Sequence, residues 1–446
     1  MPIRNVKDTD LAYYLICFDA EGNERTGDPD GQMSQRVLEV LKTEPITDVF
    51  LISHGWLGDI PDAIAQYDKW IGSMAGNTAD IERVRKKRPG FRPLLIGLHW
   101  PSKPYGEEDV SESASFAGPE MGGASPLDEM IDQYAQTLAD TPAAREALQT
   151  IFAAAIEDVA PSKMPAEVIA AYQVLDREVA LGSGDVAADQ GSDREPFDPE
   201  STFEASNDEE VASFGSFGLG ALLAPLRTMS FWKMKDRAAK FGAGAAYPLL
   251  CQLQSATSND VRFHLMGHSF GCVVMSATLA GPPTDNALVR PLDSVVLMQG
   301  ALSLWSYTSD IPHAPGQPGY FHRIFSEGRV KGPFVTTQSE HDTAVGTMYP
   351  LAAGVARQVH FAPGELPKYG ALGTYGVRGP DPAVVDMEML PANESYNFEA
   401  GKVYNLESSQ YICEMANLTS GAHSDLAHPE VAHAVWEAMM CGSPDS

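Results

Sequence analysis

A Gly-x-Ser-x-Gly pentapeptide, Gly267 to Gly271, constrains the fold of this 446-residue chain more than any other feature. The residues before it, 261–266, are mostly apolar and compatible with a short β-strand. The residues after it, 272–280, are typical of a helix, which a Gly-Pro-Pro sequence then ends. The two glycines leave room for a sharp turn between strand and helix. This pattern predicts that the hydroxyl of Ser269 is exposed at the end of a strand.

A serine in such a turn needs a histidine as its base, and the histidine needs a carboxylate to orient it. Both partners are expected at the ends of later strands, the acid before the histidine. Residues 332–338 are typical of a strand, and Asp342 follows them closely. His423 lies in a polar loop between an expected last strand, 402–413, and the last helix. We therefore expect Ser269, Asp342 and His423 to form a catalytic triad.

Each of these residues has an alternative. Ser269 could be an ordinary helix N-cap, Asp342 a turn aspartate, and His423 a histidine of a surface loop. Asp310 is the rival for the acid, and His428 is the rival for the base.

An early loop supplies a further part of the expected site. Residues 47–53 are typical of a buried strand, and it ends in His54-Gly55-Trp56. A backbone N–H of such a loop and that of the residue after the nucleophile form an oxyanion hole. We assign these donors to Trp56 and Phe270, and we expect His54 to hold the loop by a side-chain hydrogen bond.

These patterns together resemble the serine hydrolases of the α/β-hydrolase superfamily with a His-Gly oxyanion loop, as in many esterases and lipases. The resemblance covers about residues 45–100 and 225–440 and identifies no named subfamily. It implies an α/β fold with a mostly parallel central sheet flanked by helices, and cleavage of a small-molecule carboxylic ester through an acyl-enzyme. A membrane-acting lipase or phospholipase, an amidase and a thioesterase use the same triad. The non-enzyme alternative is a catalytically silent hydrolase-like binding module.

The expected division of the chain places the first part of the core in 1–100, a large acidic insertion in 101–224 and the second part of the core, with the triad, in 225–446. A second insertion at about 345–400 accounts for the 81 positions between the acid and the histidine. Its Gly-rich segment 370–376 matches no known role.

The acidic insertion is expected to be partly helical. Thr141 and Pro142 are typical of an N-cap and a first helical residue, and a second amphipathic helix follows Pro165. We expect these helices to form a cap over Ser269. The stretch 183–213 is expected to be mobile, because it has too few apolar residues to pack.

A basic cluster follows the insertion, with lysines and arginines between 227 and 240 around Phe231 and Trp232. We expect a helix that packs its apolar side on the sheet and displays the basic side chains to solvent. A contact with anionic lipid is the alternative.

The net charge of −29 is concentrated in residues 105–213, which hold 25 Asp and Glu against 4 Lys and Arg. This balance argues against nucleic acid as a partner. The absence of a long apolar run predicts no stable membrane insertion, and the lack of a signal-peptide pattern predicts a cytoplasmic protein. Five scattered cysteines indicate neither a disulfide framework nor a zinc site, and no nucleotide-binding or His-Glu-x-x-His motif occurs. We therefore expect no cofactor and no metal; the oligomeric state stays open.

Overall fold

A computed structural model describes most of the chain. The residues that it describes are 3–7, 9, 11–26, 31–56, 58–102, 126–158, 161–179, 193–206, 221–283, 288–353, 366–379, 381–416 and 420–441.

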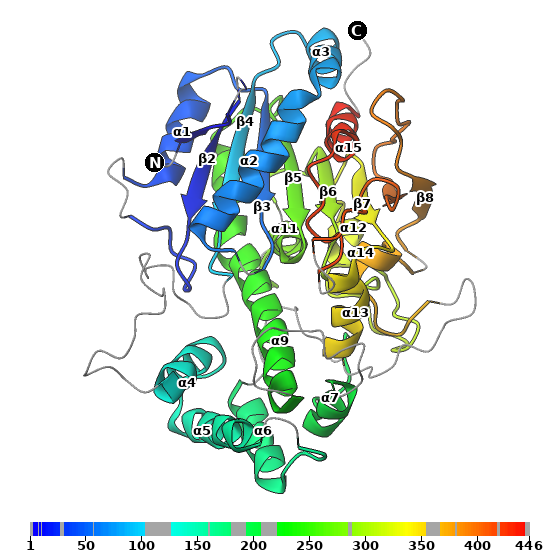
Figure 1. The fold of residues 1–446 in the computed structure, drawn as a ribbon. Helices are drawn as coiled ribbons and strands as arrows, with labels where there is room; N and C mark the ends of the chain where they lie inside the picture. Colours follow the sequence, from blue (N-terminus) through cyan, green and yellow to red (C-terminus); the bar gives the residue numbers. More distant parts are fainter. Residues whose placement is uncertain are drawn as a thin grey trace.

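Within these residues nine strands form one sheet in the order β1-β2-β4-β3-β5-β6-β7-β9-β8 (Figure 1). The strands are β1 Ile3–Asn5, β2 Ala12–Cys17, β3 Asp48–Ser53, β4 Pro93–His99, β5 Arg262–His268, β6 Ser294–Met298, β7 Phe334–Gln338, β8 Val384–Glu388 and β9 Val403–Glu407. The edge strand β1 is antiparallel to β2, and every other pair is parallel. The expected α/β architecture with a mostly parallel sheet is confirmed.

Helices cover both faces of this sheet. The helices are α1 Met33–Thr43, α2 Ile60–Gly76, α3 Thr78–Lys87, α4 Pro126–Thr137, α5 Pro142–Glu157, α6 Ala166–Val179, α7 Pro199–Ser206, α9 Ala224–Phe241, α10 Tyr247–Ser255, α11 Phe270–Ala280, α12 Arg323–Ser326, α13 Thr343–Ala352, α14 Leu372–Tyr375 and α15 Pro429–Met440; the 3-10 turn η1 Ala221–Leu223 precedes α9, and the π-helical turn η2 Gly242–Ala246 follows it.

Strand β3 shows how the sheet builds a core on each face. Its side chains alternate between the faces, as the two-residue period of a strand requires. Val49 and Leu51 pack into a cluster with α1, α9, α10 and α11, whereas Phe50 and Ile52 pack into one with α2, α3 and α15. All four side chains are buried. The sequence of the strand is therefore continuously apolar, which is typical of a parallel strand covered on both faces.

The acidic insertion forms a third apolar cluster, made by α4 to α7, η1 and the beginning of α9. These helices lie beyond one edge of the sheet, and α9 runs from them to the sheet (Figure 1). The predicted start of α5 is confirmed: Pro142 is its first residue, and the Thr141 hydroxyl accepts a hydrogen bond from the Ala144 N–H at 3.1 Å.

Two observations in this region differ from what the sequence suggested. The part of 183–213 that the structure describes, 193–206, is packed: it contains α7, whose Phe203 is buried in the cluster of the insertion. Residues 183–192 and 207–213 lie outside the described residues. Lys235 of the basic cluster does not face solvent but is completely buried beside Asp193, because that carboxylate pairs with its ammonium group.

The expected last strand, 402–413, ends earlier, at Glu407, and β8 from the second insertion pairs with it as the edge strand. Among the described residues no helix combines the length and the apolar character that crossing a membrane requires.

Candidate active site

Ser269 lies in the turn between β5 and α11, at the edge of the sheet where the parallel strands end. The sequence predicted an exposed hydroxyl, but the residue is only 6% exposed, because the loop of Gly55 packs against it. Its backbone has φ 55° and ψ −122°, a strained conformation for a residue with a side chain. The glycines on both sides are necessary. A Cβ at Gly271 would lie 2.2 Å from the Ser53 carbonyl oxygen, and one at Gly267 would lie 2.6 Å from the Gly271 carbonyl oxygen. Ser269 occupies the N-cap position of α11, but its side chain makes no capping hydrogen bond, unlike that of an ordinary N-cap serine.

Asp342 and His423 are brought together, although 81 positions separate them. Asp342 follows β7, and its Oδ2 accepts a hydrogen bond from His423 Nδ1 at 2.7 Å. Its Oδ1 accepts from the Val345 N–H at 3.1 Å, in the first turn of α13. The loop of His423 is fixed by the Ala422 N–H, which donates to the His341 carbonyl at 2.9 Å. Two loops from different strands therefore hold one imidazole against one buried carboxylate.

His268, the residue before Ser269, links the serine turn to the histidine loop. Its Nε2 donates to the His423 carbonyl oxygen at 2.8 Å, and the two rings are 4.7 Å apart. Burial holds the pKa of His268 well below its usual value, with a smaller contribution from the nearby His423, so the His268 ring is neutral. Among the described residues no hydrogen bond joins the Ser269 hydroxyl to the His423 ring.

The His54-Gly55-Trp56 loop lies directly against Ser269. A Cβ at Gly55 would be 2.7 Å from the Ser269 Cβ and 3.2 Å from its Oγ. Trp56 and Phe270 have their rings 5.7 Å apart. Phe270 is the first residue of α11, where backbone N–H groups have no partner within the helix.

His54 is completely buried and holds this loop, in the structural role that the sequence predicted. Its Nδ1 donates to the Gly55 carbonyl at 2.8 Å. Its backbone N–H donates to the Tyr67 hydroxyl at 2.9 Å, and its carbonyl accepts from the Trp100 indole at 3.1 Å. Burial lowers the pKa of His54 to about 4, so the ring is neutral near pH 7 and needs no counter-ion.

The two rival residues are engaged elsewhere. Asp310 is exposed, and its carboxylate accepts from the Gly316 N–H at 2.6 Å. His428 pairs with Asp425 at 2.6 Å. The structure therefore connects His423 with Asp342, whereas the catalytic roles of both stay predictions.

The helices α5 and α6 were expected to form a cap over Ser269, and that role stays a prediction. Helices α5 and α6 pack on each other and on α4, α7, η1 and α9. The aromatic ring beside Phe270 comes from Phe231 of α9, at 5.0 Å, and Phe231 also lies 5.9 Å from the ring of Trp56. Helix α9 thus places an aromatic side chain next to the serine turn.

A second Ser–His–Asp arrangement lies at the opposite edge of the sheet. His264 Nδ1 is 2.7 Å from the Ser294 hydroxyl, and its Nε2 is 3.1 Å from Asp48, which also pairs with Arg88. All members of this Ser–His–Asp set are buried, and Ser294 is an ordinary residue of β6. Unlike Ser269, Ser294 lies within a strand and not in a strained turn, so we interpret the set as structural.

One group of side chains among the described residues has donors close enough to hold a metal ion: Asp80, His433 and Glu437, between α3 and α15. Arg83 pairs with Asp80 and, at 3.0 Å, with Glu437. The guanidinium already supplies the positive charge that these carboxylates need, so we interpret the group as an ion-pair network.

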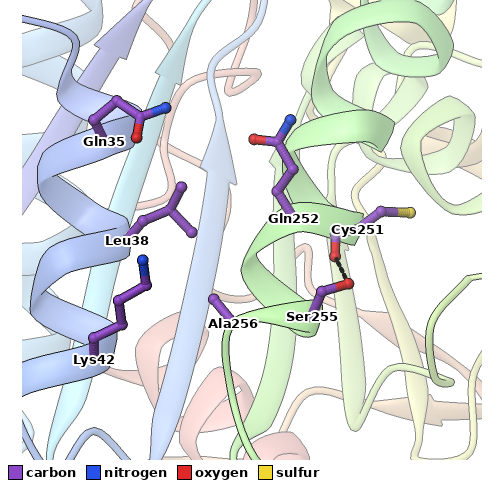
Figure 2. Close-up of a pocket in the computed structure, with 7 residues that line it drawn as sticks. All are labelled: Gln35, Leu38, Lys42, Cys251, Gln252, Ser255 and Ala256. Atoms are coloured by element: carbon purple, nitrogen blue, oxygen red, sulfur yellow. Dashed lines mark hydrogen bonds between the residues drawn. The ribbon is translucent and has the colours of Figure 1, made fainter.

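A surface depression lies between α1 and α10 and is shown in Figure 2. It is lined by Gln35, Leu38, Lys42, Cys251, Gln252, Ser255 and Ala256. The Ser255 hydroxyl donates to the Cys251 carbonyl at 2.7 Å, which leaves this side chain committed to its own helix. None of the seven residues belongs to the predicted site.

Sequence reasoning missed one residue of the site. Gln299, directly after β6, donates from its side-chain amide to Asp342 at 2.9 Å. Its position at a strand end of the same sheet edge was the only signal in the sequence.

No protein-family model matches the chain, and neither the curated proteins nor the solved structures include a significant match. The structure itself shows a mostly parallel α/β protein with a strained serine and a histidine–carboxylate pair at one edge of its sheet.

Proposed function

We propose that this protein is a serine hydrolase with an α/β-hydrolase fold, which cleaves carboxylic esters through an acyl-enzyme. One observation carries the proposal: the strained Ser269 turn contacts, through the neighbouring His268, the loop of a histidine whose Nδ1 is held by a buried carboxylate at 2.7 Å. Strain at a residue whose side chain caps nothing favours a chemical role over a structural one.

The chemistry follows from these groups. His423 Nε2 takes the proton of Ser269 as its oxygen attacks the ester carbonyl, while Asp342 stabilises the imidazolium. The Trp56 and Phe270 amides stabilise the oxyanion. The protonated His423 then returns its proton to the alcohol, which leaves. Water attacks the acyl-serine, His423 accepts a proton again, and the carboxylic acid is released as Ser269 is restored.

Labelling with a fluorophosphonate followed by peptide mass spectrometry tests the nucleophile. We expect modification of the Ser269 peptide and none in Ser269→Ala. Modification of another serine, or none at all, would refute the proposal and favour the catalytically silent binding module.

Variants test the partners. His423→Ala and Asp342→Asn should each reduce kcat on a short p-nitrophenyl ester about 10⁴-fold, because each removes one member of a unit. His428→Ala and Asp310→Asn are matched controls, since the structure places both outside the unit. If Asp310→Asn lost activity while Asp342→Asn kept it, Asp310 would be the acid. The same comparison of His428→Ala with His423→Ala would identify the base.

The same triad serves other acyl compounds, so a substrate panel decides the leaving group. Chain-length series of esters, thioesters and anilides separate an esterase from a thioesterase and an amidase. Activity that appears only with phospholipid vesicles would indicate a membrane-acting lipase or phospholipase and not an esterase.

A further inference from the structure

Gln299 has an unusual backbone for its residue type. Together with Ser269 it is one of two non-glycine residues with positive φ among those that the structure describes, at φ 47°. It directly follows β6, next to the end of β5 that carries Ser269, and its side chain is completely buried. A strained conformation persists only where the surroundings enforce it, and such positions cluster at functional sites.

The side chain of Gln299 is directed at the carboxylate of Asp342. Its Nε2 donates to Oδ2 at 2.9 Å, and this is the oxygen that also accepts from His423 Nδ1. The Val345 N–H occupies Oδ1. Both oxygens are therefore held, and the carboxylate cannot rotate away from the imidazole without the loss of a hydrogen bond.

The orientation of the Gln299 amide follows from its partners. The Thr337 hydroxyl accepts from the Gln299 backbone N–H at 3.1 Å, so its own proton is free to donate to Oε1 at 2.8 Å. On the other side Nε2 faces two groups that can only accept, the Asp342 carboxylate and the Gly373 carbonyl at 3.3 Å. A flipped amide would place an oxygen against both acceptors, so the observed orientation is the favourable one.

The Gly-rich segment 370–376 holds Gln299 in place. Its Gly373 carbonyl accepts from the Gln299 amide and, at 2.9 Å, from the backbone N–H of Ser339 in the loop of the acid. The Gly373 N–H donates to the Gly300 carbonyl at 2.9 Å. A Cβ at Gly373 would lie 2.8 Å from the Gln299 carbonyl carbon and 2.9 Å from its Cα. Only glycine lets this segment approach so closely, which gives the segment a role that its sequence did not reveal.

We propose that Gln299 is a positioning residue of the hydrolase: it fixes the Asp342 carboxylate in the orientation that accepts the His423 Nδ1–H, and segment 370–376 fixes Gln299. This inference rests on the proposed function. It adds a residue that acts through the acid and does not touch the substrate.

Gln299→Met tests the proposal, because methionine keeps the length of the side chain and removes the amide. We expect kcat to fall roughly 10- to 100-fold, as for loss of a hydrogen bond to a charged group, with KM changed less than about twofold. Without the amide donor the negative charge of the carboxylate is less stabilised, so it interacts more strongly with the imidazolium. The acid limb of the kcat/KM profile should therefore move to higher pH by about 0.5 to 1 unit.

Proton NMR gives a readout that does not depend on turnover. A histidine Nδ1–H donated to a carboxylate resonates downfield of the backbone amides, and Asp342→Asn identifies that signal. In Gln299→Met we expect the signal to shift or broaden. Gln254→Met is the matched control: Gln254 is equally buried and donates to the Arg290 carbonyl at 2.9 Å, far from the acid in the chain, so its variant should keep the wild-type signal and pH profile.

A wild-type signal and pH profile in Gln299→Met would overturn the inference. If that variant does not fold, Thr337→Val replaces it, because loss of the hydroxyl frees the Gln299 amide and should change the same readouts in the same direction. If fluorophosphonate does not label Ser269, the proposed function is refuted. The NMR comparison is independent of that result, because it shows whether Gln299 holds the histidine–carboxylate pair.

Discussion

The buried ion pair between Lys235 and Asp193 yields the sharpest prediction about stability. Lys235 of α9 is 0% exposed and Asp193 is 1% exposed. The Lys235 ammonium also donates to the Tyr349 hydroxyl at 2.7 Å and lies 4.7 Å from the centre of the Trp232 ring. The Tyr349 hydroxyl in turn donates to Asp193 at 2.6 Å. Asp193→Ala removes the carboxylate from a completely buried ammonium group.

Removal of one partner of such a pair costs about 3–5 kcal/mol, because the remaining buried charge loses the opposite charge beside it. The same segment offers a matched control two residues further on. Glu195 pairs with Lys368 at 2.6 Å, but the two side chains are 44% and 46% exposed. Glu195→Ala should therefore cost no more than about 1 kcal/mol.

Urea denaturation followed by circular dichroism measures both variants. We expect a lower midpoint for Asp193→Ala with little change in the slope, and almost no change for Glu195→Ala. The double variant Asp193→Ala/Lys235→Met should regain much of the lost stability, since an apolar side chain replaces the ammonium group that has lost this carboxylate. Equal effects of the two single variants, or no recovery in the double variant, would refute the assignment of the energy to the buried pair.

Two further predictions concern the loop beside Ser269. Gly55→Ala should reduce kcat at least tenfold with a wild-type circular dichroism spectrum, because the new Cβ would lie 2.7 Å from the Ser269 Cβ; unchanged turnover would show that the loop and the serine do not need this contact. The depressed pKa of His54, about 4 against 6.5, means that the unfolded chain binds its proton first as the pH falls. The free energy of unfolding should therefore decrease by about 3 kcal/mol between pH 6.5 and 4 on account of this residue, and His54→Gln should show a shallower pH dependence; an equal dependence in both proteins would contradict the cause.

The sequence predicted the parts of the structure that local patterns determine. The strand, the Gly-x-Ser-x-Gly turn and the helix are adjacent in the chain, so the position of Ser269 follows from short-range sterics. The ends of parallel strands meet at one edge of a sheet, so a carboxylate and a histidine after two later strands were expected to meet, and Asp342 and His423 do.

Contacts between distant segments could not be predicted in this way. Lys235 stands in a helix whose other basic residues suggest a solvated face, and its burial depends on Asp193 and Tyr349, 42 and 114 positions away. The role of Gln299 depends on Asp342, which lies 43 positions further along the chain. A glutamine has no periodicity or motif that marks such a contact.

Helix α9 has a consequence for any attempt to exchange the insertion between proteins. The first turns of this 18-residue helix give Leu226 and Met229 to the apolar cluster of the insertion, whereas Phe231 and Trp232 belong to the core of the sheet. A transferred insertion that ends at residue 224 would therefore lack Leu226 and Met229, which complete its apolar cluster. Both the transferred insertion and the remaining protein would then expose apolar side chains that are normally buried. The better junction for such an exchange lies inside the helix, between Met229 and Phe231. The residues before it should come from the protein that supplies the insertion, and the residues after it from the protein that supplies the sheet.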